Sequence, residues 1–240
     1  MKEKMNIMEI KDLSLSRDPE TEFREVSFEI GEGEIISLES DTEERVSALF
    51  DVLTGRVLPD KGKVLFLGKD VTGLLPQDLV KVGVARAFSG RNVFLGMTVL
   101  QNLQVSFLSS RGEGREFARL LQAPAAENER ILSIMRHFGL DEYRDDPAGY
   151  IPEGKQLLLD FAMVLLQNPR VLFLDRPSAS LDHGERGRVE EAIVNLARGG
   201  TGVCVSMGRR FFREEKFNRV LMVTREGVSV RDSGVMMPSK

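Results

Sequence analysis

The chain lacks the features that mark secreted, membrane-spanning and nucleic-acid-binding proteins. Among its 240 residues there is one cysteine, Cys204, so no intrachain disulfide can form and a reducing cytoplasm is expected. No apolar run approaches the roughly 20 residues of a membrane span, and the N-terminus lacks the apolar region of a signal peptide. The net charge of −4, with both signs interspersed, gives no basic footprint for nucleic acid. Any membrane role must therefore be peripheral.

What the chain does contain fits one α/β domain, with 42% hydrophobic and 29% charged residues. Apolar alternation and β-branched residues predict strands at 7–15, 25–30, 34–38, 63–67, 83–88, 171–174, 202–206, 219–223 and 227–231. Helical spacing predicts helices at 44–54, 76–81, 99–109, 127–138, 154–167 and 184–198. The N-terminal segment is predicted to form antiparallel β-structure. The later alternation of strand and helix implies that those strands pair in parallel. The core with its β-subdomain is expected at about 1–90 and 166–240, and a helical subdomain at about 91–165.

The stretch LESDTEERVSALFDVLTG, residues 38–55, has the order strand, loop and helix of a phosphate-binding loop but lacks its chemistry. That loop, G-x-x-x-x-G-K-[ST], supplies backbone N–H groups, a lysine for charge and a hydroxyl for magnesium. Its key positions are here Ser40, Arg45, Val46 and Ser47. Only the Ser47 hydroxyl is retained. The full loop is Ser40, Asp41, Thr42, Glu43, Glu44, Arg45, Val46 and Ser47.

Acidic residues crowd this loop, namely Glu39, Asp41, Glu43 and Glu44. At about 6 Å and an effective dielectric near 20, each would repel a phosphate charge by roughly 2–3 kcal/mol. The runs SDTE and DTEE also fit the capping-box pattern, so Ser40, Asp41, Glu43 and Glu44 are predicted to cap the helix with their own side chains. Taken alone, the loop favours an ordinary capped helix that never held phosphate.

Two longer segments point to a family. The stretch from GKVLFLGKDVTG through GRNVFLGMTVLQNL, within residues 28–108, and NPRVLFLDRPSASLD, residues 168–182, resemble the ATP-binding cassette (ABC) ATPases of branched-chain amino-acid importers. The resemblance covers about 200 residues. It implies a P-loop NTPase-like core with an antiparallel β-subdomain and an inserted helical subdomain, working as a dimer beneath a transmembrane permease.

Where that family keeps its catalytic groups, this chain departs from the pattern. Asp175 and Ser47 match the magnesium positions, but Arg176 replaces the glutamate that polarises water and cannot accept a proton. Ser89 stands for the glutamine that reaches the metal, and Met207 for the switch histidine. Arg17 holds the place of the aromatic residue that stacks on adenine, and arginine can still stack. Arg176 is expected to pair with Asp175 or with a loop acid such as Glu44.

The signature motif of the family, typically L-S-G-G-Q, is replaced by Ile151, Pro152, Glu153, Gly154 and Lys155. Lys155 is expected to be a solvated side chain rather than an anion contact. In the family, each nucleotide site forms between the phosphate loop of one subunit and the signature motif of the other. Because both the loop and the signature depart from the pattern here, both nucleotide sites of any dimer would be compromised. The counterpart of GRNVFLGMTVLQNL receives the permease in relatives, so permease contacts are expected from Arg91, Val93, Phe94 and Met97.

Three functions remain open from the sequence. The first is a pseudo-ATPase that supports or regulates an importer, peripheral on the inner face of the cell membrane, with a permease and an intact cassette or a second copy as partners. The second is a weak or unconventional ATPase in which Arg45, Ser47 and Asp175 still hold a nucleotide. The third is a scaffold with the cassette fold but no transport role. No cofactor is expected, and ATP and magnesium would bind only if residual nucleotide binding survives. Nucleic acid is not expected as a partner.

Overall fold

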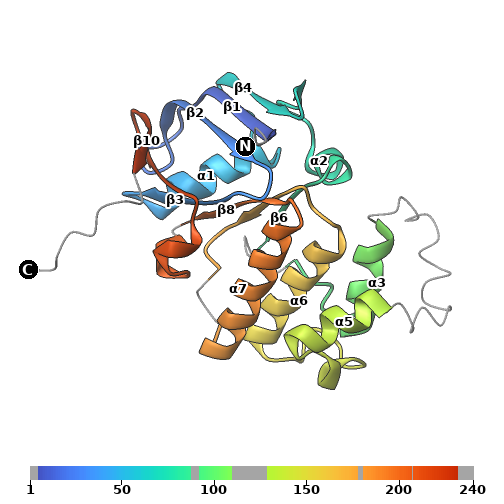
Figure 1. Ribbon diagram of the computed structural model, residues 1–240. Helices are drawn as coiled ribbons and strands as arrows, with labels where there is room; N and C mark the ends of the chain where they lie inside the picture. Colours follow the sequence, from blue (N-terminus) through green and yellow to red (C-terminus); the bar gives the residue numbers. More distant parts are fainter. Residues whose placement is uncertain (1–4, 88–91, 110–128, 178–180, 207, 232–240) are drawn as a thin grey trace, which may run out of the picture.

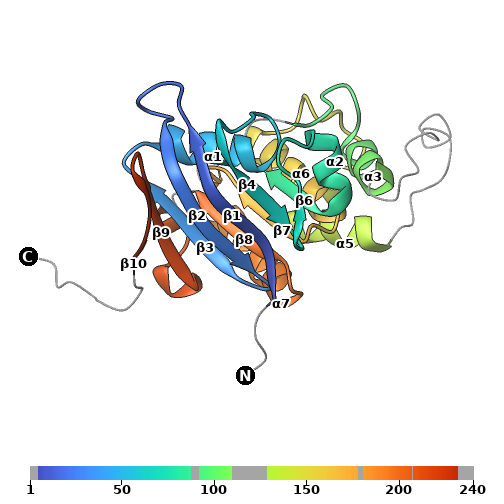
Figure 2. The ribbon, with the colours of Figure 1, turned by 90° about the horizontal axis from the view of Figure 1, so that it is seen from above.

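A computed structural model describes residues 5–87, 92–109, 129–177, 181–206 and 208–231. Two sheets and a layer of helices make up the fold (Figures 1 and 2). Within these ranges no helix combines the length and the apolar character that crossing a membrane requires.

The larger sheet is mostly parallel and carries the loops of interest at one edge. Its strands are β3 (Ile35–Ser40), β6 (Val84–Ala87), β7 (Val171–Leu174), β8 (Gly202–Ser206), β9 (Arg219–Thr224) and β10 (Gly227–Arg231). They run in the order β10-β9-β3-β8-β7-β6, with only the β9–β10 hairpin antiparallel. Strands β7 and β8 are buried at every residue, as expected for central parallel strands with both faces covered.

The smaller sheet is antiparallel and lies over the first helix. Its strands are β1 (Asn6–Leu15), β2 (Phe23–Gly31), β4 (Lys61–Phe66) and β5 (Lys69–Asp70), in the order β2-β1-β4-β5. Helix α1 (Glu43–Leu53) lies between the two sheets in Figure 1. One apolar cluster joins both sheets to α1 through Phe50, which tilts against Phe173 of β7 with ring centroids 5.0 Å apart.

Helices cover the opposite face of the large sheet (Figure 1). They are α3 (Val99–Ser109), α5 (Glu129–Phe138), α6 (Glu153–Leu166) and α7 (His183–Arg198), while α2 (Pro76–Val82) precedes β6. Short 3₁₀ turns lie at Asp141–Tyr143, Gly208–Arg210 and Glu214–Lys216. The apolar residues of α6 are buried along nearly its whole length, so this helix forms the centre of the second core cluster.

The expected strands and helices are found where the described residues allow a comparison. Element ends differ by at most two residues, a difference that is common at element ends. Residues 127, 128 and 88, at the ends of one predicted helix and one predicted strand, lie outside the described ranges. The two-residue strand β5 and the 3₁₀ turns were not predicted, because so few residues carry no periodicity.

Candidate functional site

The carboxyl ends of β3, β7 and β8 meet at one edge of the large sheet, where parallel α/β sheets bind ligands. From β3 the chain runs through Asp41 and Thr42 into α1, and from β7 it runs into Asp175 and Arg176. Serine 206 ends β8 beside them, and its hydroxyl accepts a hydrogen bond from the Arg176 N–H at 2.7 Å. The positions expected for phosphate and magnesium therefore follow β3 and β7, the two strands that flank β8.

Helix α1 begins without the side-chain cap that the sequence predicted. Its N-cap is Thr42, which makes no capping hydrogen bond. Thr42 Oγ1 instead donates to the Glu20 carbonyl at 2.7 Å, and Ser40 Oγ donates to Asp41 Oδ1 at 2.9 Å. The prediction of a capping box at Ser40 or Asp41 was wrong, because Ser40 Oγ bonds to Asp41 and the Asp41 carboxylate pairs with Arg45. Acidic side chains still occupy the first turn, where they suit the helix dipole: Glu43, which is half-buried, and Glu44, which is exposed.

Arg45 is the residue that organises this loop. Its side chain is only 3% exposed and donates to main-chain carbonyls of the β1–β2 connection, with Nε 2.7 Å from Glu22 O and Nη2 3.0 Å from Pro19 O. Nη1 reaches Ser40 Oγ at 3.2 Å and also pairs with the Asp41 carboxylate. One guanidinium thus fastens the β3–α1 loop to the β1–β2 connection.

One ion pair of the loop, between Asp41 and Arg45, lies within the loop itself. Partial burial raises the pKa of Asp41, but the Ser40 hydroxyl and the Arg45 charge outweigh it, so the net pKa lies below its ordinary value. Val46, at the lysine position of a phosphate loop, is fully buried in the core. Arg17, at the adenine position, is exposed on the β1–β2 connection.

Glu39 does not face the loop as expected. The side chain is 7% exposed, and its Oε1 accepts from the Ser37 hydroxyl at 2.5 Å and from the Arg209 N–H at 3.2 Å. It therefore lies against the turn that follows β8. The expectation of four acids around one anion site was wrong for this residue, because alternation along β3 directs residues 37 and 39 to the same face.

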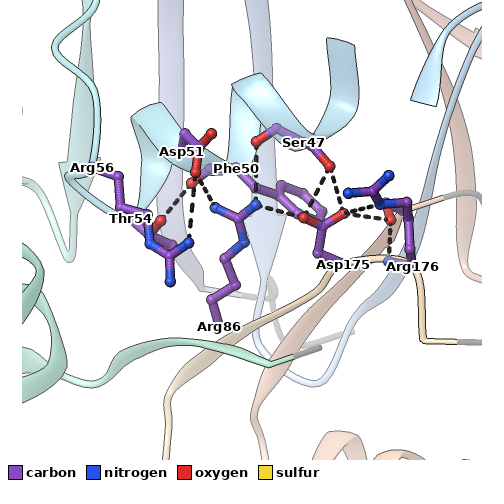
Figure 3. A network of polar contacts seen from close by, with 9 residues as sticks. Ser47, Phe50, Asp51, Thr54, Arg56, Arg86, Asp175 and Arg176 are labelled. Carbon is purple, nitrogen blue, oxygen red and sulfur yellow. Dashed lines mark hydrogen bonds and ion pairs between the residues drawn. The ribbon is translucent and has the colours of Figure 1, made fainter. Parts of the chain in front are cut away.

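Asp175 and Ser47, the two expected metal positions, do come together (Figure 3). Asp175 is 1% exposed, and Ser47 Oγ lies 2.8 and 2.9 Å from its two carboxylate oxygens. Ser206 Oγ adds a third contact at 3.2 Å. Arg86 Nη2 donates to Asp175 Oδ2 at 2.5 Å. The carboxylate is therefore surrounded by protein donors.

Arg86, from β6, was not singled out from the sequence. Its side chain is 6% exposed, Nη1 donates to Asp51 Oδ1 at 2.6 Å, and its guanidinium lies 5.8 Å from the centre of the Phe50 ring (Figure 3). The signal was present in the strand VARA, since an arginine inside a buried apolar strand requires a buried acidic partner. Its Nε has no hydrogen-bond partner among the described residues.

Arg176 pairs with Asp175, one of the two partners expected for it. The Nε of Arg176 lies 3.8 Å from Asp175 Oδ1, and the side chain is 49% exposed (Figure 3). Its backbone has φ of +52°, a left-handed conformation that is uncommon for residues other than glycine. Ser89, Arg91 and Met207, which were also assigned to this site or its permease contact, lie outside the described residues.

The signature-like residues begin helix α6. Ile151 is buried, Pro152 is the N-cap, and Glu153 and Gly154 start the first turn. Lys155 was expected to be solvated, but its side chain is 17% exposed and its Nζ lies 3.5 Å from Glu185 Oε1. Glu185 also closes the capping box of α7 with Asp182. The lysine thus joins two helices.

The turn that precedes α3 presents apolar side chains to the surface. Val93 is buried, Met97 is half-buried, and Phe94 and Leu95 are 48% and 54% exposed. Asn102, fully buried in α3, holds this turn: it accepts from Phe94 N at 2.7 Å and donates to the carbonyls of Phe94, Met97 and Thr98. Sequence reasoning missed Asn102, although a polar residue on the buried face of a helix was a usable signal.

Comparison with known proteins agrees with this architecture. A family model described as ABC transporter matches residues 23–179. The high-affinity branched-chain amino acid transport ATP-binding protein LivG of Salmonella typhimurium is 32% identical over 177 residues, which cover 71% of this chain and 69% of LivG. The chain belongs to the ABC transporter family. The ribose import ATP-binding protein RbsA of Bacillus subtilis is 28% identical, over 82% of this cassette and 38% of RbsA.

Solved structures confirm the fold of the cassette. A nucleotide-free ATP-binding cassette from an ABC transporter superposes with a TM-score of 0.74 at 21% identity, covering 93% of this chain and 90% of that one. A cassette in its ADP conformation gives 0.73 at 20% identity, with coverage of 94% and 90%. At these identities the likeness concerns the fold alone, and it bears out the predicted P-loop NTPase-like ABC core.

Proposed function

We propose that this cassette is a pseudo-ATPase subunit of an amino-acid importer of the branched-chain type. In this role it contacts a transmembrane permease and a second cassette, either an intact partner or another copy of itself. It stabilises or regulates the transporter without hydrolysing ATP. The place of action that follows is the inner face of the cell membrane, with the chain held there by its partners.

The observation that carries the proposal is the closure of the loop by Arg45. In a phosphate loop the space enclosed by backbone N–H groups accepts the anion. Here the Arg45 side chain is buried and donates to two carbonyls of the β1–β2 connection, and Thr42 adds a third link to the same connection. A nucleotide would have to break these bonds, and a hydrogen bond to a charged group contributes about 1.5–3 kcal/mol. The loop residues do not fit a triphosphate.

The chemistry of hydrolysis also lacks a base. Arg176 follows Asp175 where the family has a carboxylate, and a guanidinium stays protonated at every physiological pH. It therefore cannot take a proton from water. The Arg176 Nε lies 3.8 Å from Asp175 Oδ1, so a positive group stands where the family has the base.

The 93–97 turn supports a partner-binding role. Phe94 and Leu95 expose large apolar side chains, and Tyr150, 88% exposed, belongs to the segment whose Gly149 N–H bonds to the Leu95 carbonyl. Exposed apolar side chains grouped in this way are typical of contact surfaces. We propose that this surface, Phe94, Leu95 and Tyr150, receives the cytoplasmic end of a permease helix.

Co-isolation tests the function directly. The tagged chain expressed with its neighbouring transport genes is expected to retain a permease and to show no ATP hydrolysis of its own. Phe94→Ser should release the permease, whereas Val82→Ser, which removes an exposed apolar side chain on α2, should not. A chain that isolates without any membrane subunit or second cassette would refute the proposal.

A second candidate, weak nucleotide binding, has one observation in its favour. The Ser47 hydroxyl and the Asp175 carboxylate remain in contact at 2.8 Å, as two magnesium ligands of one site would be. For a nucleotide to bind without hydrolysis, the Arg45 side chain would have to leave its hydrogen bonds in the loop. Mg-ATP titration separates this candidate from the first.

A further inference from the structure

We propose that Arg86 is a built-in cation at the metal position of this cassette, and that it keeps divalent metal away from Asp175. The inference relies on the proposed function only for the identity of that position. In the family, a carboxylate after β7 and a hydroxyl early in α1 are expected to hold magnesium. Here the Ser47 hydroxyl donates to Asp175, and the Asp175 carboxylate already has a positively charged partner in Arg86 (Figure 3).

The donor set does not fit a magnesium ion. Magnesium demands a near-ideal octahedron of oxygen ligands at about 2.0–2.1 Å and retains several waters. Asp175 is 1% exposed, and its two oxygens accept hydrogen bonds from Ser47, Ser206 and Arg86. The Arg86 contact, at 2.5 Å, lies on Oδ2, one of the two carboxylate oxygens of Asp175.

The surrounding charges oppose a divalent cation as well. Two carboxylates, Asp51 and Asp175, face the Arg86 guanidinium, which donates one nitrogen to each. Arg176 approaches Asp175 at 3.8 Å, and Arg56 approaches Asp51 at 4.0 Å. Three guanidiniums therefore surround two carboxylates. A divalent ion placed here would enter a region where positive charge already exceeds negative charge.

Several contacts hold the Arg86 side chain in this position. Its side chain is 6% exposed, its guanidinium lies near the Phe50 ring, and Nη2 makes a further contact with the Ser47 carbonyl at 3.4 Å. The arginine therefore joins β6, β7 and α1, the three elements that a bound metal and nucleotide would otherwise bring together. Removing its charge leaves two acids without their shared partner, and a divalent ion becomes the natural replacement.

The test measures manganese binding to the full chain by the loss of the free Mn²⁺ electron paramagnetic resonance signal, with no nucleotide present. The wild type is expected to leave Mn²⁺ free up to about 1 mM. Arg86→Gln is expected to bind it at least about tenfold more tightly, and adding Asp175→Asn should abolish that binding. Arg56→Gln, which removes the exposed arginine beside the same Asp51, serves as the matched control and should resemble the wild type.

Two results would overturn the proposal. One is wild-type Mn²⁺ binding that Asp175→Asn removes. The other is a folded Arg86→Gln chain that gains no affinity. If Arg86→Gln does not fold, Arg86→Lys retains the charge and should fold without binding Mn²⁺, and the wild-type titration still decides. Because nucleotide is absent throughout, the outcome is independent of whether the cassette binds ATP.

Discussion

The β3–α1 loop and the 93–97 turn differ in which of their side chains are buried and which are exposed. In the loop, the polar groups bond to one another, with Arg45 buried among carbonyls of the β1–β2 connection. In the turn, the polar residue Asn102 is buried so that Phe94 and Leu95 can be exposed. The first region has its polar groups bonded within the protein, and the second exposes apolar side chains. Under the proposed function, this contrast corresponds to a cassette that has kept its partner contacts while losing its nucleotide chemistry.

Restoring the residues of a phosphate loop should have the largest effect, because it should give the β3–α1 loop affinity for nucleotide. A chain with Ser40→Gly, Glu43→Gly, Arg45→Gly, Val46→Lys and Arg176→Glu restores the groups that hold and activate a nucleotide in the family. Mg-ATP affinity should rise at least about tenfold above the wild type, measured by calorimetry. The same chain without Val46→Lys is the control. Unchanged affinity in a folded chain would mean that the backbone path of the loop has been remodelled.

Removing Arg45 alone should cost stability rather than create a site. Arg45→Ala removes the pair with the exposed Asp41 carboxylate and three further hydrogen bonds of a buried guanidinium, so the free energy of unfolding should fall by about 3 kcal/mol in urea titrations. Arg17→Ala, at the exposed arginine of the β1–β2 connection, should stay within about 0.5 kcal/mol of wild type. Equal effects from the two variants would contradict the assigned role of Arg45.

The conformation of the 93–97 turn should depend on the buried residue Asn102. Asn102→Ala leaves Phe94 N–H and several carbonyls without their partner, which should lower the free energy of unfolding by about 2–3 kcal/mol. It should also weaken co-isolation of the permease, because the turn loses its shape. Gln101→Ala, one residue earlier and half-buried, is the matched control. A stable, permease-binding Asn102→Ala chain would show that the turn needs no such support.

The smallest expected effect concerns Asp41. Its folded pKa lies below its ordinary value near 3.8, so the carboxylate stabilises the fold above that pH, and the contribution is lost as pH falls through the folded pKa. Asp41→Asn should therefore flatten the acid side of the stability profile below about pH 4, measured by urea unfolding at several pH values. The side chain is 66% exposed, so solvent screening keeps the effect small. A variant profile as steep as the wild type would contradict this assignment.

Much of the architecture could be predicted, because apolar periodicity and motif order are properties of the sequence. Strands β7 and β8 were readable as continuous buried runs, and Asp175 was placed correctly beside Ser47. The hydrogen bonds of the loop could not be predicted. Capping-box spacing at Ser40 and Asp41 was present, yet Ser40 Oγ bonds to Asp41 and the Asp41 carboxylate pairs with Arg45. The hydroxyl of the actual N-cap, Thr42, bonds to Glu20, 22 residues away in sequence.

Long-range ion pairs escaped prediction for the same reason. Arg86 meets Asp175 across 89 residues of sequence, and Lys155 meets Glu185 between two helices. Sequence spacing carries no information on which strand ends become neighbours until the sheet order is known. The rule that a buried arginine needs an acidic partner could have identified Arg86 as important, but not its partner.

The most direct test of the central claim is a calorimetric titration of Mg-ATP into the purified wild-type chain. The closed loop predicts no binding heat up to millimolar nucleotide, and no change in the unfolding temperature over the same range. Saturable binding with one nucleotide per chain would contradict the account, because it would show that Arg45 leaves the loop when ATP arrives.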